Sequence, residues 1–254
     1  MSILKQDAFG TPLMVKRLLI IIFGMIAFPR LFIFNRSVVK GMENLRNLPD
    51  HNVLFVCNHQ TYFMDVVLMY AVFSANKNRT KNLNLFYYAL NPILNFYYVA
   101  ALETMRSGIL PKLMSYTGAV TIKRTWREAG KSIKRKVDPK DLESIFKALD
   151  SGWVTTFPQG TTKPYSPGRR GTAFLIKHQK PIVVPLEING FRRAFNKSGL
   201  FMKKRRTELT MVIKEPLELT YEESSEEIME KIMNQIGQSE EFYPGGVEVE
   251  PKKN

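Results

Sequence analysis

Short apolar runs rich in β-branched and aromatic residues alternate with helical patterns along this chain, and this alternation constrains the fold more than any other feature. Such runs are typical of buried strands when turn residues bound them. The runs that we interpret as strands are residues 53–57, 83–88, 153–157, 182–186 and 209–213. Among the helical patterns, Ser224 and Glu227 form a capping box, and residues 141–149 have helical periodicity. The pattern predicts one domain of the α/β class with several buried strands.

The N-terminal segment carries an uninterrupted apolar run over residues 18–28. The run has 11 residues, whereas a helix that spans a bilayer needs about 20. Basic side chains flank it, namely Lys16, Arg17, Arg30 and Arg36. We therefore expect residues 1–36 to form an apolar anchor in the membrane interface, as one helix or as a helical pair broken at Pro29. A helix buried in the core is the alternative. The domain itself is expected over 37–238, followed by a polar tail over 239–254.

The chain is strongly basic, with 37 lysine and arginine residues against 23 acidic residues and a net charge of +14. Such a surface attracts polyanions, which include nucleic acid, an anionic membrane, and an acidic carrier protein or coenzyme. The basic residues concentrate in residues 123–136 and 203–206. A nucleic-acid module is disfavoured because the sequence has no helix-turn-helix, zinc or RNA-binding signature. The apolar N-terminus would also have no role in such a module. We expect a lipid bilayer as partner and no nucleic acid.

The cysteine count and the glycine pattern both argue against metal and cofactor chemistry. The single cysteine, Cys57, excludes an internal disulfide and a multi-cysteine metal site. No glycine-rich loop of the kind that binds nucleotides is present. We therefore expect no metal and no cofactor.

His59 lies two residues after the end of the predicted strand 53–57, and catalytic residues gather at strand ends. A histidine can take a proton from a hydroxyl at neutral pH when a carboxylate holds its second ring nitrogen. Asp65 is the candidate for that carboxylate. A structural histidine that bonds its own loop is the alternative. Cys57 as a nucleophile is disfavoured, because it lies inside the apolar strand.

Three later segments accompany Asn58-His59 and Asp65. The segment from Gly118 to Arg124 places an arginine after a short β-like run, Phe157-Pro-Gln-Gly-Thr161 follows a predicted strand with a turn, and Pro181-Ile-Val-Val-Pro185 is a hydrophobic strand. In this order and at these separations, the segments resemble the motifs of the glycerolipid acyltransferase family of the 1-acyl-glycerol-3-phosphate type. The resemblance covers roughly residues 40–216 and implies a mixed central β-sheet flanked by helices.

The resemblance implies a role for each matching residue. His59 would deprotonate the hydroxyl of the acceptor, which attacks an acyl thioester, and Asp65 would orient His59. Arg124 would hold the anionic head of the acceptor, a role that suits a permanently charged guanidinium. The other substrate-binding residues would be Asn58, Gly118, Lys123, Pro158, Gln159, Gly160 and Thr161. The acyl donor would be acyl carrier protein or coenzyme A thioester, used as a co-substrate.

This sequence departs from the family pattern at three places. Five residues separate His59 from Asp65, where the family has four. On a regular helix neither spacing brings the pair together, because the side chains would point about 140° apart with four intervening residues and about 120° apart with five. The family's pair must therefore meet across a junction between loop and helix. In this chain either that junction absorbs one more residue, as a looser loop or a π-bulge, or Asp65 is not the partner, and we retain Asp65 as the candidate. Gln159 stands where the family has glutamate, and Thr121 and Lys123 replace the usual phenylalanine and aspartate.

We interpret the chain as a membrane-associated O-acyltransferase that acts on the free hydroxyl of a lysolipid. The expected acceptor is 1-acyl-glycerol-3-phosphate, which would give phosphatidic acid. A mono-acylated amino-acid lipid is the alternative acceptor, and a membrane lipid-binding protein without turnover is the alternative of another class. The expected location is the cytoplasmic face of the inner (plasma) membrane.

Overall fold

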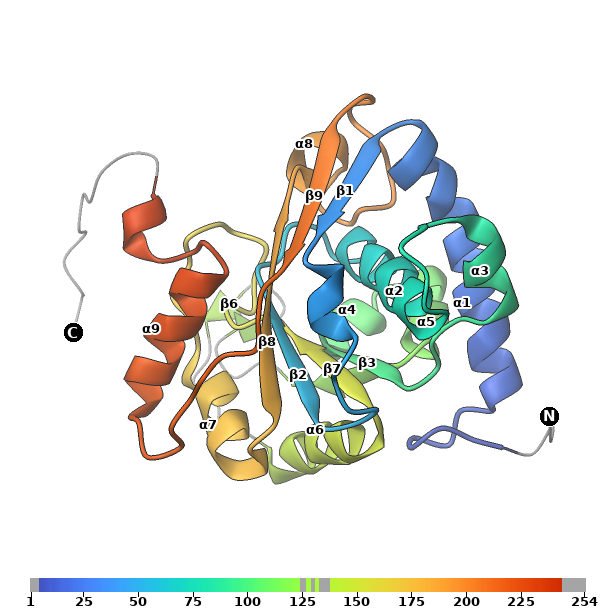
Figure 1. Ribbon diagram of the computed structural model, residues 1–254. Coiled ribbons are helices and arrows are strands. Elements are labelled where there is room, and N and C mark those ends of the chain that lie inside the picture. The colour runs from blue at the N-terminus through green and yellow to red at the C-terminus, as the bar shows by residue number, and fades with distance from the viewer. Residues whose placement is uncertain (1–4, 124–126, 129–130, 133–137, 244–254) are drawn as a thin grey trace.

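A seven-stranded mixed sheet lies at the centre of the fold, with helices on both of its faces (Figure 1). The computed structural model describes residues 5–123, 127–128, 131–132 and 138–243. The strand order is β1-β9-β8-β2-β7-β3-β4, and neighbouring strands are parallel except for the antiparallel pair β8 and β9. The expected α/β fold with a mixed central sheet and flanking helices is confirmed.

The strands of the central sheet are β1 (Arg36–Lys40), β2 (Val53–Cys57), β3 (Phe96–Ala101), β4 (Ala119–Ile122), β7 (Trp153–Thr156), β8 (Ile182–Asn189) and β9 (Glu208–Ile213). A separate antiparallel pair consists of β5 (Arg127–Glu128) and β6 (Lys131–Ser132). The α-helices are α1 (Leu13–Phe28), α2 (Met64–Lys77), α3 (Leu85–Leu90), α4 (Leu102–Met105), α5 (Ile109–Ser115), α6 (Pro139–Ser151), α7 (Arg170–Gln179), α8 (Phe191–Ala194) and α9 (Ser225–Gln235). A π-helix, η1 (Pro29–Ile33), continues α1, and short 3-10 helices are η2 (Met42–Leu45) and η3 (Glu240–Phe242).

Strand β2 explains the layering, because all five of its residues are buried and successive side chains point to opposite faces. Phe55 packs into the cluster formed with α1, α2 and α3, whereas Leu54 and Val56 pack into the cluster formed with α6, α7 and α9. A strand buried on both faces reads as a continuous apolar run in the sequence. This is why β2 was predictable with its full bounds.

Most of the predicted elements are present in the structure. The runs 53–57, 153–157, 182–186 and 209–213 correspond to β2, β7, β8 and β9, and the helical pattern of 141–149 corresponds to α6. The capping box is also confirmed, since the Ser224 hydroxyl accepts the Glu227 amide at the start of α9.

The predicted strand over 83–88 is wrong, because most of this segment belongs to helix α3. In α3, Tyr88 lies against α1 at Gly24, and its hydroxyl donates to the carbonyl oxygen of Ile20 at 2.7 Å. A Cβ on Gly24 would lie 1.9 Å from the Tyr88 ring, so the contact requires glycine. Packing of the aromatic residue against another helix thus overrides its intrinsic preference for strands.

Helix α1 has two different apolar faces. One face packs against the domain through Ile20, Gly24 and Ala27, while the opposite face leaves Leu18 and Met25 more than half exposed. At Pro29 the chain does not turn back but continues as the π-helix η1. Among the described residues, no helix combines the length and apolar character needed to cross a bilayer.

A buried ion pair fixes the start of α1. Lys16 is fully buried, and its ammonium lies 3.2 Å from the Asp7 carboxylate and 4.1 Å from the centroid of the Tyr97 ring. Burial lowers the pKa of Lys16 to about 8, and the adjacent Asp7 charge opposes this shift. The pair joins the segment before α1 to the sheet.

Candidate active site

His59 and Asp65 meet where β2 ends and α2 begins. His59 Nδ1 lies 2.9 Å from Asp65 Oδ2. The Asp65 side chain is fully buried, whereas the His59 side chain is 13% exposed, so a substrate can reach the ring. With its Nδ1 proton directed at a carboxylate, a neutral imidazole presents the lone pair of Nε2. Within the described ranges, no group is hydrogen-bonded to Nε2.

The loop between His59 and α2 absorbs the additional residue. Asp65 lies in the first turn of α2 and its carboxylate reaches back over the loop. It accepts the amides of Gln60 at 2.7 Å and Thr61 at 3.0 Å, and the Thr61 hydroxyl at 2.6 Å. The carboxylate therefore closes a turn as well as holding the imidazole. The helix itself stays regular from Met64 onward.

Strand β8 and the segment after it hold this loop in place. The Asn58 side chain donates to the Ile188 carbonyl at 2.9 Å and accepts the Ile188 amide at 2.8 Å. Further along, the amide of Tyr62 donates to the Lys197 carbonyl at 3.0 Å. Asn58 is 3% exposed, so its side chain serves the junction between loop and strand and is not presented to a substrate.

Phe157 covers one face of the His59 ring. The two rings stack with centroids 3.9 Å apart and planes 23° apart. Strands β2 and β7 are parallel neighbours, so the residues after each strand lie at the same edge of the sheet. After Phe157, buried Pro158 leads into a turn in which the Gly160 amide donates to the Phe157 carbonyl at 2.8 Å, with Gly160 at a φ of 62°. Thr161, which is partly exposed, follows this turn.

The side chain of Gln159 points into the protein. It is 1% exposed, and its amide nitrogen donates to the Ser166 carbonyl at 2.9 Å and to Gln238 Oε1 at 3.2 Å. Gln238 Oε1 also accepts the Tyr165 amide at 2.9 Å. The described contacts of Gln159 therefore connect its loop to the segment after α9.

Arg192 is a residue that the sequence analysis missed. Its guanidinium donates to the carbonyl oxygens of His59, at 3.2 Å, and Thr162, and its amide donates to Gln60 Oε1 at 3.2 Å. Partial burial lowers the pKa of Arg192, while the nearby Asp65 charge acts in the opposite direction. Arg192 thus ties the His59 loop to the loop after β7. The sequence signal that could have indicated Arg192 is its position shortly after the predicted strand 182–186.

The residues before and after β4 lie at opposite ends of the parallel strands. Gly118 precedes β4 and packs inside, since a Cβ there would lie 2.5 Å from the Phe96 carbonyl oxygen. It therefore lies at the opposite end of the parallel strands from His59. Lys123 follows β4 at the His59 end and lies 3.3 Å from Asp138. Three strand spacings separate β4 from β2, which corresponds to about 14 Å. Arg124 lies outside the described residues.

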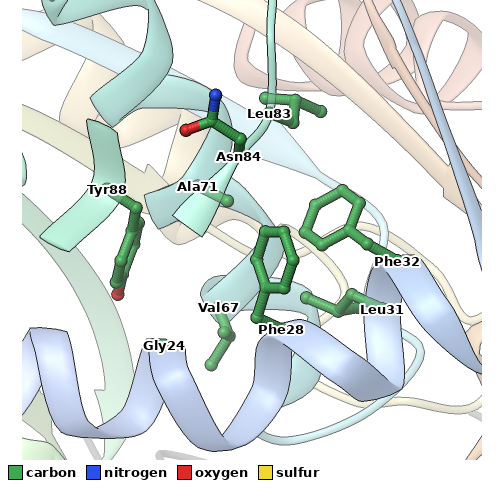
Figure 2. Close-up of a pocket in the computed structure, with 9 residues that line it drawn as sticks. All are labelled: Gly24, Phe28, Leu31, Phe32, Val67, Ala71, Leu83, Asn84 and Tyr88. Atoms are coloured by element: carbon green, nitrogen blue, oxygen red, sulfur yellow. The ribbon is translucent and has the colours of Figure 1, made fainter. Parts of the chain in front are cut away.

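Two cavities lie away from His59. Figure 2 shows a narrow apolar crevice of about 10 Å³, which is lined by Gly24, Phe28, Leu31, Phe32, Val67, Ala71, Leu83, Asn84 and Tyr88. Its volume fits about one water molecule. A larger, open hollow of about 580 Å³ borders Ile182, where β8 begins, at the other end of the strand from His59. Neither cavity includes the His59–Asp65 pair.

Cys57, the single cysteine of the chain, is not available as a nucleophile at this site. Burial raises the pKa of the Cys57 thiol, and the charge of Asp65 raises it further, which keeps the sulfur protonated. In the described part of the chain, no group of three or more His, Cys, Asp or Glu side chains is placed to hold a metal. The chemistry available from described residues is therefore acceptance of a proton at His59 Nε2.

Comparisons with known proteins identify a family and a similar fold for this chain. A family model described as Acyltransferase matches residues 36–189, which contain His59, Asp65 and the segment after β7. The fold is similar to the crystal structure of the 1-acyl-sn-glycerophosphate (LPA) acyltransferase PlsC from Thermotoga maritima, with a TM-score of 0.52 and 20% sequence identity over 85% of this chain and 75% of that chain. A search of curated protein sequences gives no significant match. Because the family model covers more than half of its length, this chain belongs to the acyltransferase family.

Proposed function

We propose that this acyltransferase moves a fatty acyl group from a thioester donor to the free hydroxyl of a lysolipid, with His59 as the general base. The observation that carries the proposal is the contact of 2.9 Å between His59 Nδ1 and Asp65 Oδ2 in a partly exposed site. This arrangement leaves Nε2 as the proton acceptor. The acyltransferase family implies both a lipid acceptor and an acyl thioester donor.

In the proposed reaction, His59 Nε2 takes the proton of the acceptor hydroxyl as its oxygen attacks the thioester carbonyl carbon. The carbon–sulfur bond then breaks, and the imidazolium returns the proton to the departing thiolate. Asp65 stabilises the imidazolium that forms in between. Phe157 restrains the ring on one face. No acyl-enzyme forms, which agrees with the protonated and fully buried Cys57.

We propose 1-acyl-glycerol-3-phosphate as the acceptor and the membrane surface as the place of reaction. Lys123 is a cation at the same edge of the sheet as His59 and suits a phosphate head group. The exposed apolar face of α1, which includes Leu18, Met25 and Ile26, suits the interface of a bilayer. Acyl carrier protein and coenzyme A thioesters are the two candidate donors.

The experiment gives purified protein a panel of lysolipids with a labelled acyl donor, either carrier protein or coenzyme A thioester. We expect His59→Ala to lower kcat by about 10²- to 10⁴-fold, the usual contribution of a general base. His51→Ala is the matched control, because His51 is exposed in a loop, and it should retain full activity. Unchanged turnover in His59→Ala would sink the base assignment. Vesicle binding by the unaltered protein without any acyl transfer would support a lipid-binding protein instead.

A further inference from the structure

Two segments that are far apart in the sequence form one surface near the active site. They are residues 33–34, at the end of η1, and residues 201–206, in the loop before β9. The Arg206 amide donates to the Phe34 carbonyl at 2.7 Å. Between them, the buried Asn35 side chain donates to the Arg30 carbonyl at 2.8 Å and accepts the Thr207 amide at 3.0 Å. These bonds join the two segments into one unit.

This surface combines exposed apolar tips with exposed cations. Ile33 is 68% exposed and Phe201 is 71% exposed, although both side chains are large and apolar. The guanidinium of Arg205 lies 4.9 Å from the centroid of the Phe34 ring. We call this surface the basic–aromatic patch and define it as Ile33, Phe34, Phe201, Lys203, Lys204 and Arg205. Segments 29–36 and 199–207 contain no acidic residue.

We propose that the basic–aromatic patch binds a bilayer that contains anionic lipid. Lysine and arginine side chains are attracted to anionic head groups, while aromatic and aliphatic tips enter the boundary between head groups and acyl chains. An acidic protein would match the cations, but the exposed Ile33 and Phe201 tips favour lipid. The patch also adjoins the exposed apolar face of α1, because η1 continues that helix without a break.

The patch is fixed relative to the catalytic loop. Strand β9 is antiparallel to β8, and β8 is parallel to β2, so the start of β9 and the end of β2 lie at the same edge of the sheet. In Figure 1 the end of the blue N-terminal helix and the orange loop before β9 meet at the top of the molecule. The amide of Phe63, in the His59 loop, donates to the Ser198 carbonyl at 3.1 Å, a few residues before the patch. Binding of the patch would therefore hold His59 near head-group depth.

The test measures binding of the full chain to vesicles by co-sedimentation. Vesicles of phosphatidylcholine alone are compared with equal mixtures of phosphatidylcholine and phosphatidylglycerol. Each basic residue near an anionic surface strengthens binding about fivefold, so Lys203→Gln with Lys204→Gln should weaken binding to the mixed vesicles roughly 30-fold. The matched control is Lys81→Gln with Lys140→Gln, which removes the same charge from exposed positions outside the patch. Phe201→Ser should weaken binding at low and high salt alike, because its contribution is apolar.

Several results would overturn this proposal. Equal binding of the unaltered protein to both kinds of vesicle would remove the role of anionic lipid, and equal losses in the two double variants would show that only net charge matters. A double variant at Lys203 and Lys204 that binds vesicles normally but loses activity only with acyl carrier protein would assign the patch to that protein.

The link from binding to catalysis depends on the proposed function, whereas vesicle binding does not. Acylation of a short-chain lysolipid in free solution separates the two, and the Lys203 and Lys204 variants should keep their kcat in that assay. If the unaltered protein shows no acyl transfer but the vesicle results hold, only the proposed function fails.

Discussion

Replacing Asp65 by asparagine removes the carboxylate that orients His59 while keeping the shape of the side chain. In the structure, His59 Nδ1 and the Gln60 amide contact Asp65 Oδ2, whereas the Thr61 hydroxyl donates to Oδ1. An asparagine that keeps its oxygen towards Thr61 turns its amide nitrogen towards His59 and Gln60. To meet that donor, His59 must present the lone pair of Nδ1, which places the proton on Nε2. The general base is then blocked at the atom that must accept a proton.

The expected loss in the Asp65→Asn variant follows from this change of tautomer. Holding a catalytic imidazole in the wrong tautomer lowers kcat by about 10⁴-fold in a Ser-His-Asp triad, which corresponds to about 5 kcal/mol in the barrier. Folding suffers separately, because the Gln60 amide loses its acceptor at a buried position, at a cost of about 1–3 kcal/mol. The catalytic effect should therefore exceed the effect on stability.

Thr61→Val separates the two effects, since it removes only the hydroxyl bond of 2.6 Å to Asp65. It should lower the free energy of unfolding by about 1 kcal/mol and leave kcat within a few-fold of the unaltered enzyme. The assay combines steady-state kinetics with urea unfolding of both variants. A folded Asp65→Asn enzyme with kcat within tenfold of the original would refute the role of this carboxylate.

Two further perturbations test other parts of the structure. The unfolded chain keeps the Lys16 proton up to its ordinary pKa of 10.5, whereas the folded protein releases that proton near pH 8. Between these two values the unfolded state binds more protons than the folded state. The free energy of unfolding should therefore rise with pH across this window. Urea unfolding at a series of pH values checks this, and the rise should be absent in Lys16→Met paired with Asp7→Asn. Arg192→Met should lower the free energy of unfolding by about 2 kcal/mol, because charge-assisted bonds are lost, and should also lower kcat. Arg193→Met, at an exposed neighbour, should change neither quantity, and equal effects in the two variants would contradict the prediction.

The sequence predicts the central strands because their burial on both faces leaves a simple pattern. Runs 53–57 and 182–186 lie within adjacent parallel strands of the sheet. The structure adds that β2 and β7 are parallel neighbours, so the segments after these two strands come together at one edge of the sheet. The stacking of Phe157 on His59 is a detail that no periodicity could reveal.

The remaining features depend on contacts between distant residues. Residues 83–88 contain part of a helix because Tyr88 packs against Gly24, which is far away in the sequence. The meeting of His59 with Asp65 depends on the path of a loop that the Lys197 and Ser198 carbonyls hold from outside. Neither feature leaves a local pattern, so sequence alone could not settle them.

Gln159 has a consequence for the order in which substitutions can accumulate. Its amide nitrogen donates to the Ser166 carbonyl, and a glutamate at this position cannot make that bond. Nor could glutamate donate to Gln238 Oε1, which already accepts the Tyr165 amide. Replacing Gln159 by glutamate would therefore remove both donor contacts and set a carboxylate against two acceptor oxygens. The effect of a change at position 159 should therefore depend on the residue at position 238, whose side chain makes the contact, and not on the residue at position 166, which accepts through its backbone carbonyl.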